Sequence, residues 1–515
     1  MRVPLNVGDF LERAALVHPE RVAIVDEPGA VGGLGTITYS EMLQRAKQMA
    51  VTLDSMGIHQ SERVAIVSPN SARFLISFFG VSAFGRILVP VNFRLNADEV
   101  SYIVEHSGSS ALLVDPEIDE SLGAVDAKVR VRLDGVEDAE LFSPAPPGVE
   151  PLPWAGDEDA PCSINYTSGT TARPKGVQLT HRNCWLNAVT FGWHTSVTDR
   201  DVLLHTLPMF HCNGWGMPYA VTAMGGRHVV LRKVDGEDIL SRVESEEVTL
   251  LCGAPAVVAA ILSAAEARRD RGQQIPGSGR VRIVVAGAPP PTRAIERVED
   301  ELGWEFIQIY GLTETAPLLT INRAPQEWDA LGPARRAPLL GRAGVPAVGV
   351  QITVDEEGEV LARSNHVFAG YWEQPEDSAR ALEGGWFHTG DGGRTDGAYT
   401  VISDRKKDVI ITGGENVSSI EVEDCLYQHP AVAETAVIGV PHEKWGETVV
   451  ALVVLREGES ATDAELIEHC RARMAHFKAP TVVEFRGSLL RTATGKLQKY
   501  KLRQPYWEGH ERSVN

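Results

Sequence analysis

The chain has 515 residues, which is more than one hydrophobic core usually supports, so we expect at least two domains. Its composition, 43% hydrophobic and 23% charged residues, is that of an ordinary globular protein. The net charge of −20 argues against nucleic acid or an anionic membrane as a partner, because both require a basic surface.

The N-terminal stretch and the cysteines predict the cellular setting. Residues 1–20 alternate charged and apolar side chains at helical spacing and lack the apolar run of a signal peptide. No run of about 20 apolar residues occurs, so no membrane span is expected. The six cysteines show no C-x-x-C spacing, which disfavours a disulfide framework and a zinc site. We therefore expect a cytoplasmic protein with buried free thiols.

Short β-branched runs alternate with amphipathic stretches from residue 63 onward. The pattern predicts strands over 63–68, 87–92 and 111–115, with helices over 70–85 and 96–108 between them. A β-α-β-α-β order implies a parallel sheet with helices on its faces. The Pro-rich segment 143–161 has no usable period and is expected to follow the surface before the next unit.

A second alternation of strands and helices covers residues 201–291, with 267–280 predicted as an exposed polar connection. After residue 404 the pattern changes to strand, helix, strand pair, helix and strand. The predicted fold class is therefore α/β, with a large N-terminal domain over 1–403 and a small α+β domain over 404–515. The large domain is expected to hold two α/β sheets and a β-barrel-like part.

The segment "INYTSGTTARPKG" concentrates hydroxyls, two glycines and an ammonium group around one turn. Exposed backbone amides, hydroxyls and a lysine suit a polyphosphate. The order Pro174, Lys175, Gly176 is not that of a Walker loop, and no useful G-x-G-x-x-G occurs, so a nicotinamide fold is disfavoured. The candidate phosphate-binding residues are Thr167, Ser168, Gly169, Thr170, Thr171 and Lys175.

Three further segments contain residues suited to nucleotide and acid chemistry. In "IYGLTET", Glu314 would be a natural hard-cation ligand beside a bound triphosphate. In "AGAPPP", Gly287 and Ala288 are small enough for a ring to approach. The segment 207–219 offers apolar side chains for a pocket wall: Phe210, Trp215 and Met217.

"YTSGTTARPKG" closely resembles the phosphate-loop signature of the adenylate-forming superfamily, which includes acyl-CoA synthetases. "IYGLTET", "WFHTGD", "DRKKD" and "RTATGKLQKYKLR" resemble further signatures of that superfamily, in its order, and together they cover most of the chain. The resemblance implies ATP, Mg²⁺ and coenzyme A as cofactors. It also implies that the small domain rotates about a hinge at Asp404 between two half-reactions.

The resemblance also implies a role for each matching residue. Tyr310 and Gly311 would lie near the adenine, Thr313 at phosphate, Glu314 at Mg²⁺, and Asp391 with Arg405 at the ribose. Lys496 would offset negative charge during adenylation, a task that suits a movable cation in a water-poor cleft. The loop with Gly413, Gly414 and Glu415 would meet the pantetheine arm of CoA. The acid would lie against Phe210, His211, Gly214, Trp215, Met217 and Tyr310, with His211 orienting its carboxylate.

The implied activity is ligation of a hydrophobic carboxylic acid to CoA through an acyl-adenylate, in the manner of medium- and long-chain acyl-CoA ligases. An amino acid is disfavoured, because His211 stands where amino-acid adenylation domains usually have an aspartate. The superfamily often has glycine at the position of Ala172 and usually proline at that of Leu490. An alanine at a position that needs positive φ costs about 1 kcal/mol.

These two departures leave a second hypothesis open, in which adenylation is impaired and the chain mainly thioesterifies an adenylate made by a partner ligase. Loading of a carrier protein, a luciferase-like oxygenase and a non-catalytic binding protein on the same fold are further alternatives. A homodimer is also left open by the sequence.

Overall fold

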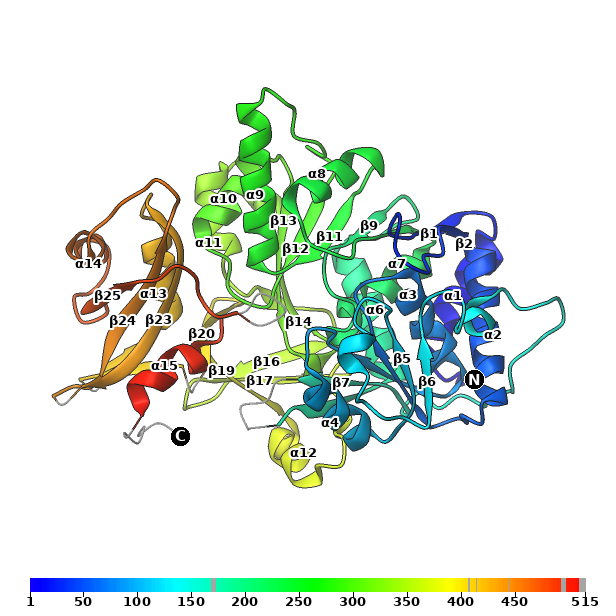
Figure 1. The fold of residues 1–515 in the computed structure, drawn as a ribbon. Coiled ribbons are helices and arrows are strands. Elements are labelled where there is room, and N and C mark those ends of the chain that lie inside the picture. The colour runs from blue at the N-terminus through cyan, green and yellow to red at the C-terminus, as the bar shows by residue number, and fades with distance from the viewer. Residues whose placement is uncertain (168–172, 406–407, 414, 443, 492–496, 509–515) are drawn as a thin grey trace.

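A computed structural model of the chain describes residues 1–167, 173–405, 408–413, 415–442, 444–491 and 497–508. Figure 1 shows a large N-terminal domain (blue to yellow) and a smaller C-terminal domain (orange to red) beside helices α10 and α11. Within these residues, no helix is long and apolar enough to cross a membrane. The α/β fold class with two domains is confirmed.

The first predicted alternation forms the middle of a seven-stranded sheet. Strand β3 (Arg63–Val67) pairs in parallel with both β4 (Ile87–Val91) and β5 (Ser109–Val114), as the β-α-β-α-β pattern predicts. The rest of the sheet consists of β6 (Val129–Arg132), β7 (Pro161–Thr167), β8 (Lys175–Thr180) and β18 (Gly370–Tyr371). Helix α4 (Ala97–Ser107) starts where Asn96 and Glu99 form a capping box, and it stops at Gly108 in a left-handed conformation.

The second alternation forms a nine-stranded sheet with the order β15-β14-β13-β12-β11-β9-β10-β1-β2. Its central strands from β10 to β13 pair in parallel. The strands are β1 (Val22–Val25), β2 (Thr36–Thr38), β9 (Val202–His205), β10 (Arg227–Val230), β11 (Leu250–Gly253), β12 (Arg282–Val285), β13 (Glu305–Gly311), β14 (Leu318–Arg323) and β15 (Val345–Pro346).

Helices cover both sheets of the large domain. They are α1 (Gly8–Val17), α2 (Tyr39–Ser55), α3 (Ala72–Gly80), α5 (Ala139–Phe142), α6 (His181–His194), α7 (Met217–Met224), α8 (Gly236–Ser245), α9 (Pro255–Asp270), α10 (Thr292–Glu301), α11 (Pro333–Leu340) and α12 (Pro375–Ala381). Residues 267–270 belong to α9, so the predicted polar connection is shorter than expected. The segment between α5 and β7 has no helix or strand, as its prolines predict.

The part expected to resemble a barrel is a four-stranded antiparallel sheet with the order β16-β17-β19-β20. Its strands are β16 (Val350–Val354), β17 (Glu359–Ser364), β19 (Phe387–Asp396) and β20 (Tyr399–Arg405). Strand β20 leads directly into the small domain, so this sheet joins the two parts of the chain.

The small domain has its own five-stranded sheet and its own hydrophobic core. Its elements are β21 (Ile410–Thr412), β22 (Glu415–Val417), α13 (Ser419–Tyr427), β23 (Val432–His442), β24 (Gly446–Leu455), α14 (Asp463–Arg471), β25 (Val482–Phe485) and α15 (Lys499–Trp507). The alternating strands and helices agree with the predicted α+β pattern, and α15 is an additional element.

Candidate active site

The predicted phosphate loop joins two strands of the seven-stranded sheet. Strands β7 and β8 are antiparallel, and Thr167 lies opposite Lys175 in their register. The hairpin therefore places these two predicted residues at the two ends of the loop. Ser168, Gly169, Thr170, Thr171 and Ala172 lie outside the described residues.

Lys175 takes part in a cluster that sequence reasoning missed. Its Nζ lies 2.6 Å from an Asp377 carboxylate oxygen and 4.9 Å from the centroid of the Tyr371 ring. The Tyr371 hydroxyl donates a 3.0 Å hydrogen bond to Oε1 of Glu314. The predicted phosphate lysine and the predicted metal ligand thus approach the same tyrosine.

Electrostatics within this cluster follow from the pairing. Hydrogen bonds from Lys175 and then Arg380 hold the pKa of Asp377 below its usual range. Burial, followed by the charge of Glu314, raises the pKa of Tyr371, so this phenol stays protonated and can donate. No sequence signal identifies Tyr371, because β18 is two residues long and comes from a distant part of the chain.

A second contact brings together two segments with predicted nucleotide-binding residues. The Tyr310 hydroxyl, at the end of β13, donates a 2.8 Å hydrogen bond to Oδ2 of Asp391 in β19. The next residue, Gly311, cannot carry a side chain, because a Cβ there would lie 1.6 Å from the carbonyl oxygen of Pro317. Thr313 is buried in the turn that follows, and Glu314 beside it is half-buried.

The turn between β12 and α10 has the conformation that its glycine predicts. Gly287 has a φ of +91°, in the left-handed region that favours glycine. Ala288 is half-buried beside it. In β20, the backbone of Arg405 lies opposite Asp391, while the Arg405 side chain is outside the described part of the structure.

The predicted acid-binding segment contains an unusual left-handed turn. Residues 212–216 all have positive φ, between 47° and 78°, and for a residue other than glycine this costs about 1–2 kcal/mol. Buried amides hold the turn: Asn165 Nδ2 donates to Asn213 Oδ1 at 3.0 Å, and Asn187 Nδ2 donates to the Trp215 carbonyl at 3.2 Å. Strain retained in this way is typical of functional sites.

The predicted pocket wall is closely packed. Phe210, Trp215 and Met217 are all buried in the main hydrophobic core, and His211 is half-buried. A cavity of about 10 Å³ touches Gly214 and Met217. This volume suits one water molecule, so the segment must shift before a carboxylic acid can enter there. The other residues that line the cavity are Leu203, Leu204, His205, Leu207 and Cys252.

Asp404 connects the two domains through its backbone and its side chain. Its strand β20 pairs with β19 of the large domain, whereas its carboxylate accepts hydrogen bonds from Ser419 N at 2.6 Å and Ser419 Oγ at 2.8 Å. Burial raises the pKa of Asp404. The position predicted as the hinge is thus attached to both domains.

A buried lysine that sequence reasoning also missed, Lys499, lies between two carboxylates beside the predicted hinge. Nζ of Lys499 lies 2.8 Å from Oε1 of Glu423 and 3.9 Å from Oδ1 of Asp404. Burial alone would lower the pKa of Lys499, but the two carboxylates outweigh it and raise the pKa. Nearby, Arg503 pairs with Asp408 at 2.8 Å. Helix α15 is therefore tied to the chain on the C-terminal side of the predicted hinge.

The remaining predicted residues of the small domain lie in or beside exposed loops. Gly413, with a φ of +61°, donates its N–H to the Trp445 carbonyl at 2.8 Å, and Glu415 is exposed. Leu490 is also exposed, and its carbonyl accepts from Gln498 N. Gly414 and Lys496 lie outside the described residues.

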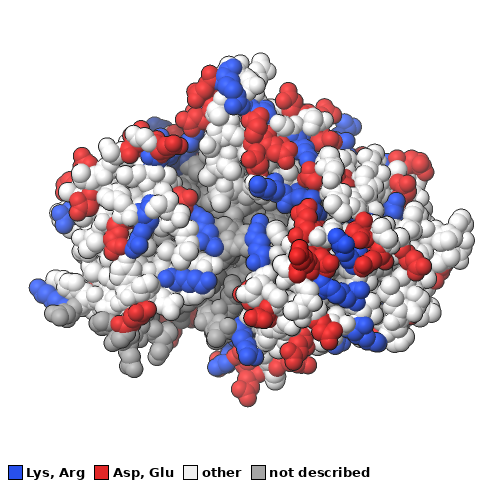
Figure 2. All heavy atoms as spheres, in the orientation of Figure 1, with Lys and Arg blue, Asp and Glu red and all other residues white. Residues whose placement is uncertain are grey.

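The surface charge favours an anionic ligand between the domains despite the net charge of −20. Figure 2 shows basic side chains on both walls of the hollow between the C-terminal domain and the large domain. Such a local field attracts phosphate-bearing molecules.

Comparison with known proteins identifies the family to which the chain belongs. The AMP-binding enzyme family matches residues 11–372, and the C-terminal domain of AMP-binding enzymes matches residues 421–496. The chain is an AMP-binding enzyme. Together with the CoA-ligase relatives described next, the family match shows that it is an AMP-forming acyl-CoA synthetase, and ATP and CoA are the substrates of such ligases.

Individual relatives of this AMP-binding enzyme are CoA ligases over nearly their full length. The chain is 37% identical to 4-hydroxybutyrate–CoA ligase 2 of Metallosphaera sedula, over 96% of the chain and 93% of the relative. It is also 37% identical to a 2-methylpropanoate–CoA ligase of Humulus lupulus, over 97% and 95%. The crystal structure of the anthranilate CoA ligase AuaEII with anthranoyl-AMP has a TM-score of 0.87 at 26% identity, covering 98% of both chains.

Proposed function

We propose that the chain activates a hydrophobic carboxylic acid and transfers its acyl group to CoA. A carboxylate oxygen attacks the α-phosphorus of ATP, the bond to the bridging oxygen breaks, and pyrophosphate leaves. The CoA sulfur then attacks the acyl carbon, and AMP leaves with the electron pair of the mixed anhydride bond. The observations that best support this proposal are the convergence of Lys175, Tyr371 and Glu314 and the hydrogen bond between Tyr310 and Asp391.

The two ends of this site suit different parts of the nucleotide. We assign Lys175 and the loop from Thr167 to the β- and γ-phosphates, since an ammonium group opposes their charge. We assign Asp391 to the ribose hydroxyls, and the hydrogen bond that it accepts from the Tyr310 hydroxyl supports this assignment. Lys175 has three N–H donors, so it can contact phosphate while Asp377 holds it in place.

The Glu314 carboxylate suits a magnesium ion bound beside the nucleotide phosphates. Within the described residues no cluster of three or more His, Cys, Asp or Glu side chains could hold a metal ion. Glu314 is a single hard oxygen ligand beside the predicted phosphate loop, and Mg²⁺ in nucleotide sites is commonly bound by one or two carboxylates plus phosphate oxygens. A bound Mg²⁺ would supply charge neutralisation at phosphate, and Glu314 would hold it.

The small domain would supply a different group to each half-reaction. We assign Lys496 to adenylation and the loop of Gly413, Gly414 and Glu415 to the pantetheine arm. Rotation about Asp404, with residues 1–403 as one body and 404–515 as the other, would exchange them. The attachment of Asp404 to both domains supports this assignment.

The acid is proposed to be a hydrophobic monocarboxylate. The segment around Phe210, Trp215 and Met217 is apolar, and His211 at its edge could orient the carboxylate. The relatives named above act on 4-hydroxybutyrate, 2-methylpropanoate and anthranilate, so short aliphatic and aromatic acids should be tested first. We expect the protein to work in the cytoplasm, which cell fractionation would test.

Two assays on one preparation test the proposal. The first measures acid-dependent exchange of pyrophosphate into ATP across a panel of aliphatic and aromatic acids. The second measures CoA thioester formation from the synthetic adenylate of the best acid, with a phosphopantetheinyl carrier protein as the alternative acceptor. A complete ligase should show both activities, the second with free CoA as the acceptor. Thioester formation without exchange would instead support impaired adenylation, the hypothesis raised by Ala172 and Leu490.

A further inference from the structure

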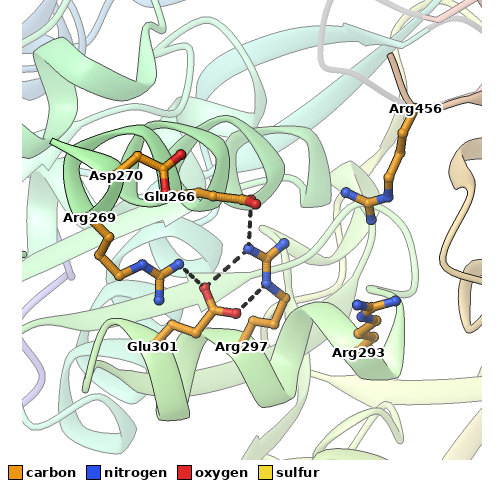
Figure 3. Close-up of a pocket in the computed structure, with 7 residues that line it drawn as sticks. All are labelled: Glu266, Arg269, Asp270, Arg293, Arg297, Glu301 and Arg456. Atoms are coloured by element: carbon orange, nitrogen blue, oxygen red, sulfur yellow. Dashed lines mark hydrogen bonds and ion pairs between the residues drawn. The ribbon is translucent and has the colours of Figure 1, made fainter. Parts of the chain in front are cut away.

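A charged hollow lies where the small domain meets helices α9 and α10, away from the residues assigned above. Its volume is about 450 Å³, and Figure 3 shows its lining. The lining residues are Glu266, Arg269 and Asp270 of α9, Arg293, Arg297 and Glu301 of α10, and Arg456 just after β24. Arginines outnumber carboxylates in this set, although the whole chain is strongly acidic.

Two of the arginines are neutralised inside the hollow. Arg297 contacts Glu301 at 2.6 Å and Glu266 at 3.2 Å, and Arg269 also pairs with Glu301. These pairs gather on one side of the hollow in Figure 3. Of the lining, they leave one carboxylate, Asp270, and two arginines, Arg293 and Arg456.

Arg293 and Arg456 differ from Arg269 and Arg297 in having no carboxylate partner among the described residues. Their side chains are exposed and make no hydrogen bond or ion pair with any other residue that the structure describes. In Figure 3 their guanidinium groups face each other across the hollow, with none of the drawn carboxylates between them. Two like charges in this arrangement repel, so an anion between them would remove a repulsion and add two attractions.

An independent contact shows that the domains meet at this edge. Asp424 of α13 accepts hydrogen bonds from Thr292 N at 2.9 Å and Thr292 Oγ1 at 3.1 Å. It thereby caps α10, whose own N-cap residue, Pro291, forms no side-chain cap bond. Because Thr292 precedes Arg293, this contact positions Arg293 relative to the domain that carries Arg456.

We propose that the hollow binds a small phosphate oxyanion, inorganic phosphate or pyrophosphate, between Arg293 and Arg456. Guanidinium groups suit this ligand, because their planar N–H pairs match phosphate oxygens in bidentate fashion. The bound anion links the two domains and stabilises the orientation in which Asp424 caps α10. A role of this link in turnover rests on the proposed rotation about Asp404, which would have to break it.

Calorimetric titration of the full chain with inorganic phosphate, and separately with pyrophosphate, tests the site without ATP or acid. We expect Arg293→Ala/Arg456→Ala to weaken binding at this site about tenfold or more, since hydrogen bonds to a charged group are lost on both sides. Arg471→Ala, which removes an exposed arginine of the small domain outside the hollow, is the matched control and should bind like the unmodified chain.

Phosphate binding that is weakened in the double variant identifies phosphate as the ligand, and such weakening for pyrophosphate alone identifies the reaction product, since the double variant leaves Lys175 unchanged. Hydrogen exchange supplies a second readout, since the anion should slow exchange of the amides in residues 292–297 and 421–427 of the unmodified chain only. Titrations in which the double variant matches the control for both anions would overturn the proposal. The outcome is independent of the ligase assays, because a chain without ligase activity can still show arginine-dependent binding.

Discussion

Replacement of Lys499 by methionine tests how the region of the predicted hinge is held together. Methionine keeps most of the side-chain volume but leaves Glu423 and Asp404 without their cation. Side-chain exposures of 13% for Lys499, 12% for Glu423 and 3% for Asp404 place this charge network in the interior. Removing one partner of a buried ion pair costs about 3–5 kcal/mol. We expect a loss of this size in the free energy of unfolding of the C-terminal domain.

The loss of stability in Lys499→Met should depend on pH in a defined direction. Burial already raises the pKa of Asp404 and of Glu423, and the charge of Lys499 opposes that rise. In Lys499→Met both values should rise further. A carboxyl group with a raised pKa in the folded state contributes stability below its unfolded pKa and loses it as pH rises through the folded pKa. The variant should therefore be less destabilised in mild acid than at neutral pH.

Urea unfolding of the full chain at neutral and mildly acidic pH measures both effects. Lys501→Met, at an exposed lysine of the same helix, is the control and should change stability by less than about 0.5 kcal/mol. Glu423→Gln combined with Lys499→Met should recover part of the loss, since it removes one orphaned charge. A Lys499→Met protein as stable as the control at neutral pH would refute the reasoning.

Three further variants or conditions give clear expectations. Tyr310→Phe removes the hydrogen bond to Asp391. Steady-state kinetics should show a KM for ATP about fivefold higher, with little change in kcat. An unchanged KM would argue against this pair as the nucleotide contact. Asp424→Asn weakens the cap on α10 and should shift the domain equilibrium by about 0.5–2 kcal/mol, measured by small-angle scattering or by the ratio of the two half-reaction rates; identical values in Asp424→Asn and the unmodified chain would contradict a role for this contact. Burial lowers the pKa of His205 to about 3. The contribution of neutral His205 to stability should therefore be complete above a pH of about 6.5 and decline as the pH falls towards 3. Urea midpoints of the unmodified chain and of His205→Gln should converge in acid, and parallel profiles would contradict this.

Local patterns predicted most of the secondary structure. The strands from β3 to β5 were predictable because runs such as 63–68 and 87–92 are apolar enough to be buried on both faces of a parallel sheet. The end of α9 was misjudged, because Arg268, Arg269 and Asp270 look like a solvated connection although they continue a helix whose apolar positions lie earlier.

The candidate site was predictable only where a motif is contiguous. Thr167, Lys175, Glu314 and Asp391 belong to such motifs. Tyr371 and Asp377 lie outside these motifs, and Lys499 lies within "RTATGKLQKYKLR" among other basic residues, with nothing that sets it apart. The importance of all three arises from partners that are about 60 to 200 residues away in the chain and depends on the packing of whole sheets and domains. The left-handed turn at 212–216 was equally hidden, because only Gly214 and Gly216 suggest positive φ from sequence.

The most direct test of the central claim is a product balance. The chain is incubated with MgATP, CoA and 2-methylpropanoate, and with the best acid from the panel, and the nucleotides and thioesters are quantified by mass spectrometry. The account predicts acyl-CoA, AMP and pyrophosphate in equal amounts, all dependent on the acid. Formation of ADP and phosphate, or AMP without a thioester in the presence of CoA, would contradict it.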